Sequence, residues 1–556
     1  MQTNNIVLTI PEQNNNQSTT DLSLGAITEW CSHLQISDPI ETTQSIISML
    51  KNLNSTVITV DHRFQLMETV RPITQNIYQT IKKQYINRIQ PLTPNKMINI
   101  ELSRTLQTEI LNGYKIIIQN IANDANAKLK TDILPNSIYR AFQHFNNILL
   151  SYYQLYAPEP ANLWKEVHMI YKYAEECKLT ENTITIEPGD NNNKVLIINP
   201  YKGLLFLSST NPYQWRQAEQ DLLYKYSSIW DEFINIRPFK TKDQTDNAGI
   251  FFISINEDLA PFPINVDKKT LQDTGFVLDL SKLINHIKKN NNTINNQETE
   301  IGKNGLQKLI SYLLLGPKRN LDRFNILGKV STAFGFLSTH YHINKKKTFK
   351  PENVDAADSD ENIQEFQLSA DTVFDELSTS NKNETEFKID KFLYKCNLMN
   401  IHGEGACVSF IDLSYPPIQP GELFALTINI KEEIDLDETH WNIGTVRWLK
   451  HDSQNKLIAG LQILAPFAIA AAIQLLKQDG NPNGYFQRAL LFKDNTQDFF
   501  HLITPIMQFE VGKQVKIYSY YHKEFIDVIL KSQIDSNSNF KHFIIHPKFN
   551  NNTSSV

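Results

Sequence analysis

The hydrophobic periodicity of this chain changes character at about residue 183, and this change most restricts the folds available to it. From Leu22 to Leu179, apolar residues recur at three- and four-residue spacing, and Pro and Gly are scarce. This pattern is typical of amphipathic helices. One stripe consists of Leu163, Val167, Ile170, Tyr171 and Ala174. We therefore predict an all-α bundle over residues 21–180, preceded by a disordered, Asn- and Gln-rich tail at residues 1–20.

Short apolar runs bounded by turn residues follow the helical region. The runs at residues 195–198, 204–207 and 249–255 have the composition of buried strands. Residues 213–234 read as one or two helices between them. This alternation predicts a small α+β domain over residues 181–287. An Asn-rich stretch, residues 288–297, reads as a linker.

Composition excludes several classes of protein. The 556 residues are 41% hydrophobic and 21% charged, which is typical of a soluble globular protein of several domains. A net charge of −6 argues against a nucleic acid partner. No signal peptide and no apolar run long enough to span a membrane are found, so we expect a cytoplasmic protein. The four cysteines fit no common metal motif and read as free thiols.

The second half of the chain has the pattern of a β-barrel or sandwich. Short strands separated by turn signals are predicted at residues 387–399, 406–413, 423–430, 441–450 and 457–464. A helix is predicted to begin at Pro466, followed by a C-terminal β-rich module over residues 484–548. Residues 351–386 contain eleven acidic residues and one lysine, and we predict an acidic, largely disordered insertion there.

Two arginines precede this run of strands. Arg319 and Arg323 are four residues apart, between a predicted helix at residues 302–315 and a predicted strand at residues 328–342. Guanidinium groups bind phosphate bidentately and also bind the O6/N7 edge of guanine. An arginine pair is therefore suited to a ligand that offers both groups, although a pair of surface arginines would have the same spacing.

A turn rich in glycine follows the first strand after the insertion. It contains Asn400, His402 and Gly405. Glycine allows a ligand to approach the backbone closely, and Asn can bond a base edge or stabilise the turn. An ordinary hairpin turn would have the same composition.

The arginine pair and the glycine-rich turn occur in this order within a run of predicted strands. Together they resemble the two ligand-contacting motifs of the PilZ domain. The closing strands resemble that family too, in Gly444-Thr445-Val446-Arg447-Trp448 and in the segment from Gly460 to Ile463. The resemblance implies a PilZ-like antiparallel barrel within residues 300–477. Gly460 would then lie near the ligand face. His402 stands where the family usually has Ser, and the insertion separates the two motifs.

This resemblance implies a bacterial signalling receptor that binds the second messenger cyclic di-GMP and transmits the signal to helical, partner-binding domains. Arg319 and Arg323 would hold phosphate and guanine, while Asn400, His402 and Gly405 would line the guanine site. No other cofactor, no nucleic acid and no metal are expected. The protein partner and the oligomeric state stay open. The alternative is a degenerate PilZ scaffold that binds no nucleotide and serves protein–protein interaction.

Enzymatic alternatives have little support in the sequence. The glycine fingerprints of nucleotide-binding enzymes and the Gly-x-Ser-x-Gly elbow of hydrolases are absent. His340 and His342 would share one face of the predicted strand at residues 328–342, but no carboxylate or cysteine close in sequence completes a metal site. We therefore predict that the protein is not an enzyme.

Overall fold

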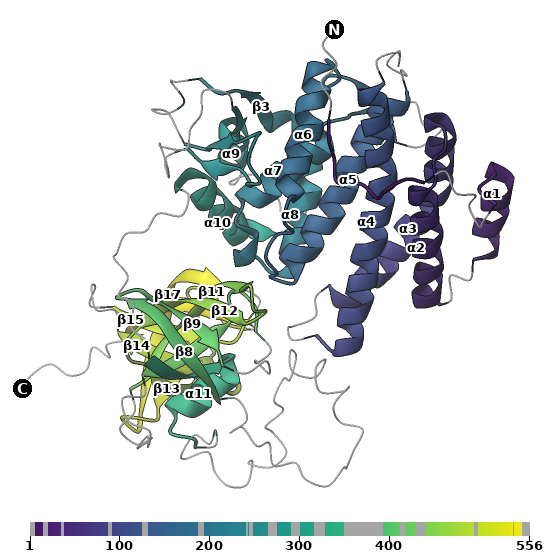
Figure 1. Ribbon diagram of the computed structural model, residues 1–556. Helices are drawn as coiled ribbons and strands as arrows, with labels where there is room; N and C mark the ends of the chain where they lie inside the picture. Colours follow the sequence, from purple (N-terminus) through teal and green to yellow (C-terminus); the bar gives the residue numbers. More distant parts are fainter. Residues whose placement is uncertain are drawn as a thin grey trace, which may run out of the picture. The chain divides into compact units, whose positions relative to one another are not determined.

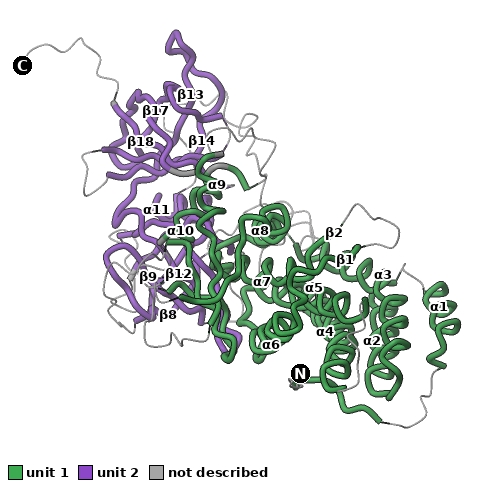
Figure 2. The backbone as a smooth tube through the Cα atoms, turned by 90° about the horizontal axis from the view of Figure 1, so that it is seen from above, with its two compact units in different colours: residues 1–319 green, residues 320–556 purple. Residues whose placement is uncertain are grey.

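The computed structural model divides into two compact units, residues 1–319 and 320–556, coloured separately in Figure 2. The described residues are 6–14, 21–34, 38–86, 92–124, 132–186, 194–240, 243, 248–264, 275–290, 301–315, 328–347, 349, 393–411, 418–428, 440–493, 499–506, 508–536 and 539–547. Arg319, Arg323 and the predicted acidic insertion at residues 351–386 lie outside them.

Helices dominate the first half of the first unit. The first six are α1 (Leu24–His33), α2 (Pro39–Ser55), α3 (Val60–Tyr85), α4 (Pro94–Asn123), α5 (Ile133–Gln154) and α6 (Leu163–Glu176). α4 packs against α2, α3 and α5, and Figure 1 shows α3, α4 and α5 side by side. Their starts follow from local sequence: the Asp38 carboxylate, for example, accepts hydrogen bonds from the first amides of α2. The predicted helical bundle is confirmed.

An α+β region completes the first unit. Its elements are β1 (Thr183–Thr185), β2 (Lys194–Leu196), α7 (Asn199–Ser209), α8 (Gln217–Ile229), β3 (Asn235–Pro238), β4 (Ile250–Ile253), β5 (Phe262–Pro263), β6 (Phe276–Asp279), α9 (Ser281–Asn290) and α10 (Gly302–Leu315). β3 to β6 form an antiparallel sheet in the order β3-β6-β4-β5. One continuous apolar core runs from the bundle into this region.

The strand predicted at residues 204–207 is wrong, because these residues lie in α7. Leu204, Leu205, Phe206 and Leu207 are all buried, so the run shows no helical periodicity in the sequence. A short apolar run of this kind cannot be assigned to strand or helix by its pattern. Pro200, in the first turn of α7, marks the true start of the helix.

The N-terminal segment also differs from expectation. Within the predicted disordered tail, the structure describes residues 6–14, and Ile6 and Leu8 are buried in the core of the bundle. The backbone N–H of Thr9 donates to Glu166 Oε1 at 2.5 Å, and Glu166 Oε2 pairs with Lys115 Nζ at 2.9 Å. Side-chain acceptors in the helices therefore hold a segment whose own composition favours disorder.

The second unit contains two closed antiparallel barrels. The first consists of β7 (Gly328–Phe334), β8 (Leu393–His402), β9 (Gly405–Phe410), β10 (Leu423–Ile428), β11 (Asn442–His451) and β12 (Leu457–Ala465). The second consists of β13 (Ile469–Leu476), β14 (Pro482–Lys493), β15 (Phe500–Thr504), β16 (Gln514–Ser519), β17 (Glu524–Ser536) and β18 (Lys541–Pro547). The predicted barrel and C-terminal β-rich module are confirmed.

The helix predicted from Pro466 is wrong. Alanines favour helix in isolation, but residues 469–476 form β13, which pairs with β14 on one side and β16 on the other. Ala471 and Ile473 face the interior of the second barrel. Tertiary pairing here overrides local propensity.

The strand predicted through His342 is also partly wrong. β7 ends at Phe334, Gly335 has a φ of 86°, and α11 (Phe336–Ile343) follows. Residues two apart on a helix do not share a face, so the geometry of a His340–His342 metal pair is lost. His340 Nε2 instead lies 3.1 Å from the Ala471 carbonyl oxygen, and burial lowers the pKa of His340 to about 3.

The buried ion pair between Lys115 and Glu166 generates a prediction for the first unit. Lys115→Met leaves a buried carboxylate with the Thr9 amide as its remaining partner, and we expect the free energy of unfolding to fall by about 3–5 kcal/mol. Lys165→Met, at an exposed position of α6, is the matched control. Urea unfolding followed by helical circular dichroism measures both, and equal midpoints for the two variants would contradict the prediction.

Candidate functional site

The described residues of the predicted site lie together on one hairpin of the first barrel. Asn400 and His402 are on β8, and Gly405 is the first residue of β9. His402 pairs directly with Gly405, so Gly403 and Glu404 form a two-residue hairpin loop. Arg319 and Arg323 are outside the described residues, so their position relative to this hairpin stays a prediction.

The register of the barrel extends this site across four strands. Asn400 pairs with Cys407 on β9, Cys407 with Gly460 on β12, and Gly460 with Trp448 on β11. Residues paired across a sheet point to the same face. We call these four residues the ligand row. The next row on the same face contains His402, Gly405, Gln462 and Thr445.

The ligand row faces outward because two β-bulges change the phase of the strands. Leu398 and Val446 are buried inside the barrel, and strict alternation would place Asn400 and Trp448 inside too. The register shifts between Leu398 and Asn400 and again between Val446 and Trp448. One extra residue in each strand therefore turns these two side chains to the outer surface.

Two aromatic rings from the flanking strands lie against glycines of the central strands. A Cβ atom built on Gly460 would be 2.0 Å from Trp448 Nε1 and 2.2 Å from Trp448 Cε2. A Cβ atom built on Gly405 would be 2.9 Å from His402 Nε2 and 2.7 Å from the Leu461 carbonyl oxygen. The glycines thus allow both rings to sit close to the sheet, as a surface suited to stacking a flat ring.

Asn400 holds a polar group without a partner. Its side-chain oxygen is buried and, among the described residues, accepts no hydrogen bond. An unsatisfied buried acceptor costs about 1–3 kcal/mol. The site therefore offers an acceptor that a donor on a bound molecule could satisfy. His402 Nδ1, in contrast, already accepts from the Glu404 amide at 3.3 Å.

Sequence reasoning placed Gly460 near the ligand face but did not identify Trp448 or Cys407 as part of it. Trp448 is half-buried, and Cys407 is buried with its Sγ 4.0 Å from Met399 Sδ. The signal for Trp448 was present in the strand Gly444 to Trp448, but the bulge that turns the indole outward has no sequence signature.

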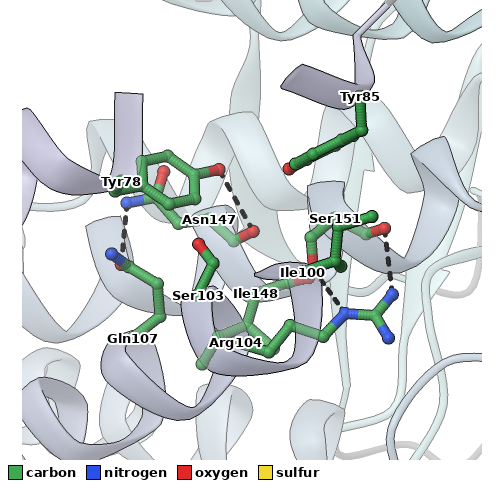
Figure 3. Close-up of a pocket in the computed structure, with 9 residues that line it drawn as sticks. All are labelled: Tyr78, Tyr85, Ile100, Ser103, Arg104, Gln107, Asn147, Ile148 and Ser151. Carbon is green, nitrogen blue, oxygen red and sulfur yellow. Dashed lines mark hydrogen bonds between the residues drawn. The ribbon is translucent and has the colours of Figure 1, made fainter. Parts of the chain in front are cut away.

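A pocket in the first unit is a poorer candidate (Figure 3). It lies among α3, α4 and α5 and is too small to admit a water molecule. Several of its polar groups pair with one another: Arg104 donates to the Ser151 hydroxyl at 3.0 Å, and Asn147 donates to Gln107 at 3.0 Å. Burial raises the pKa of the lining phenols Tyr78 and Tyr85, which keeps them neutral. This pocket is a packing defect rather than a ligand site.

No group of three or more potential metal-ligating side chains is found in the described ranges. Within the same ranges, every helix is too short or too polar to cross a bilayer.

Comparisons with known proteins agree with this architecture. Residues 25–241 match the family model described as the N-terminal domain of the cyclic-di-GMP receptor FimW, and residues 250–392 and 350–469 match the model of its middle PilZ domain. The chain is 23% identical over 578 aligned positions to the cyclic-di-GMP receptor FimW of Pseudomonas aeruginosa, covering 95% of this chain and 91% of that protein. No solved structure matches the chain.

The contact between Trp448 and Gly460 generates a prediction for this site. Gly460→Ala places a methyl group within the indole, so the ring must move, and we expect a loss of about 1–3 kcal/mol in the free energy of unfolding. Gly403→Ala is the matched control, because a Cβ atom there meets nothing within 4 Å. Thermal unfolding of both variants checks this, and equal melting temperatures would show that the indole does not rest on Gly460.

Proposed function

We propose that this chain, which belongs to the PilZ-containing family of cyclic-di-GMP receptors, binds cyclic di-GMP reversibly and without turnover on the outer face of its first barrel. The observation that carries this proposal is the ligand row, in which the unpartnered oxygen of Asn400 lies on the same face as Trp448. Guanine offers N–H donors at its edge and a flat face, which match these two features.

Each residue of the site would have a distinct role. The Asn400 oxygen would accept from a guanine N–H, and the Trp448 and His402 rings would contact the faces of the bases. Gly405 and Gly460 would keep the surface low enough for the ligand to approach the backbone. Arg319 and Arg323 would bind phosphate and the O6/N7 edge of guanine, each by paired N–H donors.

The arginines would also connect the ligand to the rest of the chain. They occur between the end of α10 at Leu315 and the start of β7 at Gly328, on either side of the boundary between the two units. A ligand that engages the arginines and the ligand row together would restrain this junction. Such a restraint changes the conformational equilibrium to the extent that the ligand binds one arrangement more tightly. We propose that this is how the signal reaches the helical, partner-binding unit.

The arginine pair provides the first test. We expect Arg319→Ala/Arg323→Ala to lose at least about 1.5–4 kcal/mol of binding free energy, because it removes charge-assisted hydrogen bonds. The measurement is calorimetric titration with cyclic di-GMP. The control is Lys477→Ala/Lys513→Ala, which removes two exposed cations from the second barrel. A well-folded wild-type chain that releases no heat would instead support the ligand-free scaffold.

Asn400 provides a second test, in which affinity and stability change differently. Asn400→Ala removes the acceptor proposed for guanine, so the binding free energy of cyclic di-GMP should become less favourable by about 1–3 kcal/mol. It also removes an unsatisfied buried oxygen, so the melting temperature of the ligand-free protein should stay level or rise. Titration and thermal unfolding on one preparation measure both. A fall in stability with unchanged affinity would assign Asn400 a structural role.

A further inference from the structure

The second barrel repeats the strand connectivity of the first. When the strands are numbered in chain order within each barrel, their order around both barrels is first, fourth, fifth, sixth, third and second. The second strand then pairs with the first and closes the barrel. All of these neighbours are antiparallel in both barrels. The residue ranges matched by the two family models end at residue 469, where the second barrel begins.

A local turn fixes which residues of the two barrels correspond. Before the fourth strand of each barrel stands a glycine with positive φ, Gly421 at 81° and Gly512 at 86°. The Gly421 amide donates to the Val446 carbonyl at 2.7 Å, and the Gly512 amide donates to the Leu530 carbonyl at 2.7 Å. In each barrel a register shift directly follows the accepting residue, Val446 or Leu530.

The residue correspondence between the two barrels is the same whichever way around the barrel it is followed. Starting from Val446 and Leu530, the pairing can be followed through the sixth and third strands, or through the fourth and first strands. Both routes make Leu398 of β8 equivalent to Leu491 of β14. Both leucines face the barrel interior and are buried. The two barrels therefore share one fold, residue by residue.

This correspondence locates the second barrel's counterpart of the ligand row. Asn400, Cys407, Gly460 and Trp448 are equivalent to Phe492, His501, Ile544 and Ser532, respectively. The unpartnered amide and the glycine are thus replaced by larger apolar side chains, and the indole by a hydroxyl. The imidazole of His501 lies 2.9 Å from His542 and stacks on Phe492.

The same face differs in burial between the barrels. Asn397 is exposed and Ser409 half-buried on the first barrel, whereas their equivalents Leu490 and Ile503 are both 0% exposed. Leu490, Ile503 and Phe492 point away from the interior of the second barrel. They form an apolar cluster with residues of the first barrel and α11, namely Leu423, Ile443, Ala465, Phe336 and Ile343.

The segment before the second barrel also lacks the arginines. Residues 466–468, Pro-Phe-Ala, connect β12 to β13 directly. The first barrel, in contrast, is preceded by the segment that contains Arg319 and Arg323. The second barrel therefore has neither the cationic segment nor the polar face proposed for the nucleotide.

We propose that the second barrel is a nucleotide-free copy of the first, in which the face equivalent to the ligand row serves as the docking surface for the first barrel and α11. The chain then has a single nucleotide site. The statement about nucleotide rests on the proposed function, whereas the docking surface does not.

The docking surface is tested with two isoleucines that both point outward from the second barrel. Ile503 is 0% exposed and Ile529 is 37% exposed. We expect Ile503→Ala to lower the melting temperature of the full-length chain by several degrees and Ile529→Ala to change it little. Removing side-chain carbons destabilises a protein where the side chain is buried and has little effect where it is exposed to solvent. Equal, small shifts would overturn the docking surface.

The single site is tested by titrating the wild-type chain and Arg319→Ala/Arg323→Ala with cyclic di-GMP. Complete loss of binding in the variant supports one site. Residual binding at part of the wild-type stoichiometry would overturn the nucleotide-free second barrel while leaving the proposed function in place. No binding by the wild-type chain would overturn the proposed function alone, and the isoleucine pair would still test the docking surface.

Discussion

The register of the first barrel is the constraint on which the candidate site depends. In an antiparallel sheet a shift of one residue moves a side chain to the opposite face. Leu398 and Val446 point into the barrel, and Asn400 and Trp448 would follow them without the bulges at Met399 and Arg447. The bulges keep the apolar core closed and, at the same time, place an amide and an indole on the outside. Core and site are therefore consequences of the same irregularities.

Much of the fold could be predicted from the sequence, because its strongest signals are local. The predicted strands at residues 423–430 and 457–464 lie within two residues of β10 and β12. Two of the errors arose where tertiary contacts decide the local structure. The alanines of β13 are held extended by strands on both sides, and residues 6–14 are held by Glu166 and the apolar core of the bundle.

The candidate site was predictable in part for the same reason. Asn400, His402 and Gly405 belong to one short motif, and the structure places them on one hairpin. The other half of the ligand row comes from β11 and β12, about fifty residues later, and reaches Asn400 only through the pairing of four strands. A bulge depends on the packing of a closed barrel rather than on a particular residue type, so Trp448 could be assigned to a strand but not to a face.

The two barrels illustrate how one fold serves different surfaces. An outer face of a sheet must be hydrated or covered, and its side chains decide which. On the first barrel, Asn397 and Ser409 keep the face polar beside an unsatisfied amide, a combination that carries a cost unless a ligand completes it. On the second, Leu490 and Ile503 make the equivalent face apolar, and burial against the first barrel removes the cost of exposing it. The same backbone fold thus carries a polar face with an unpartnered acceptor in the first barrel and a buried apolar face in the second.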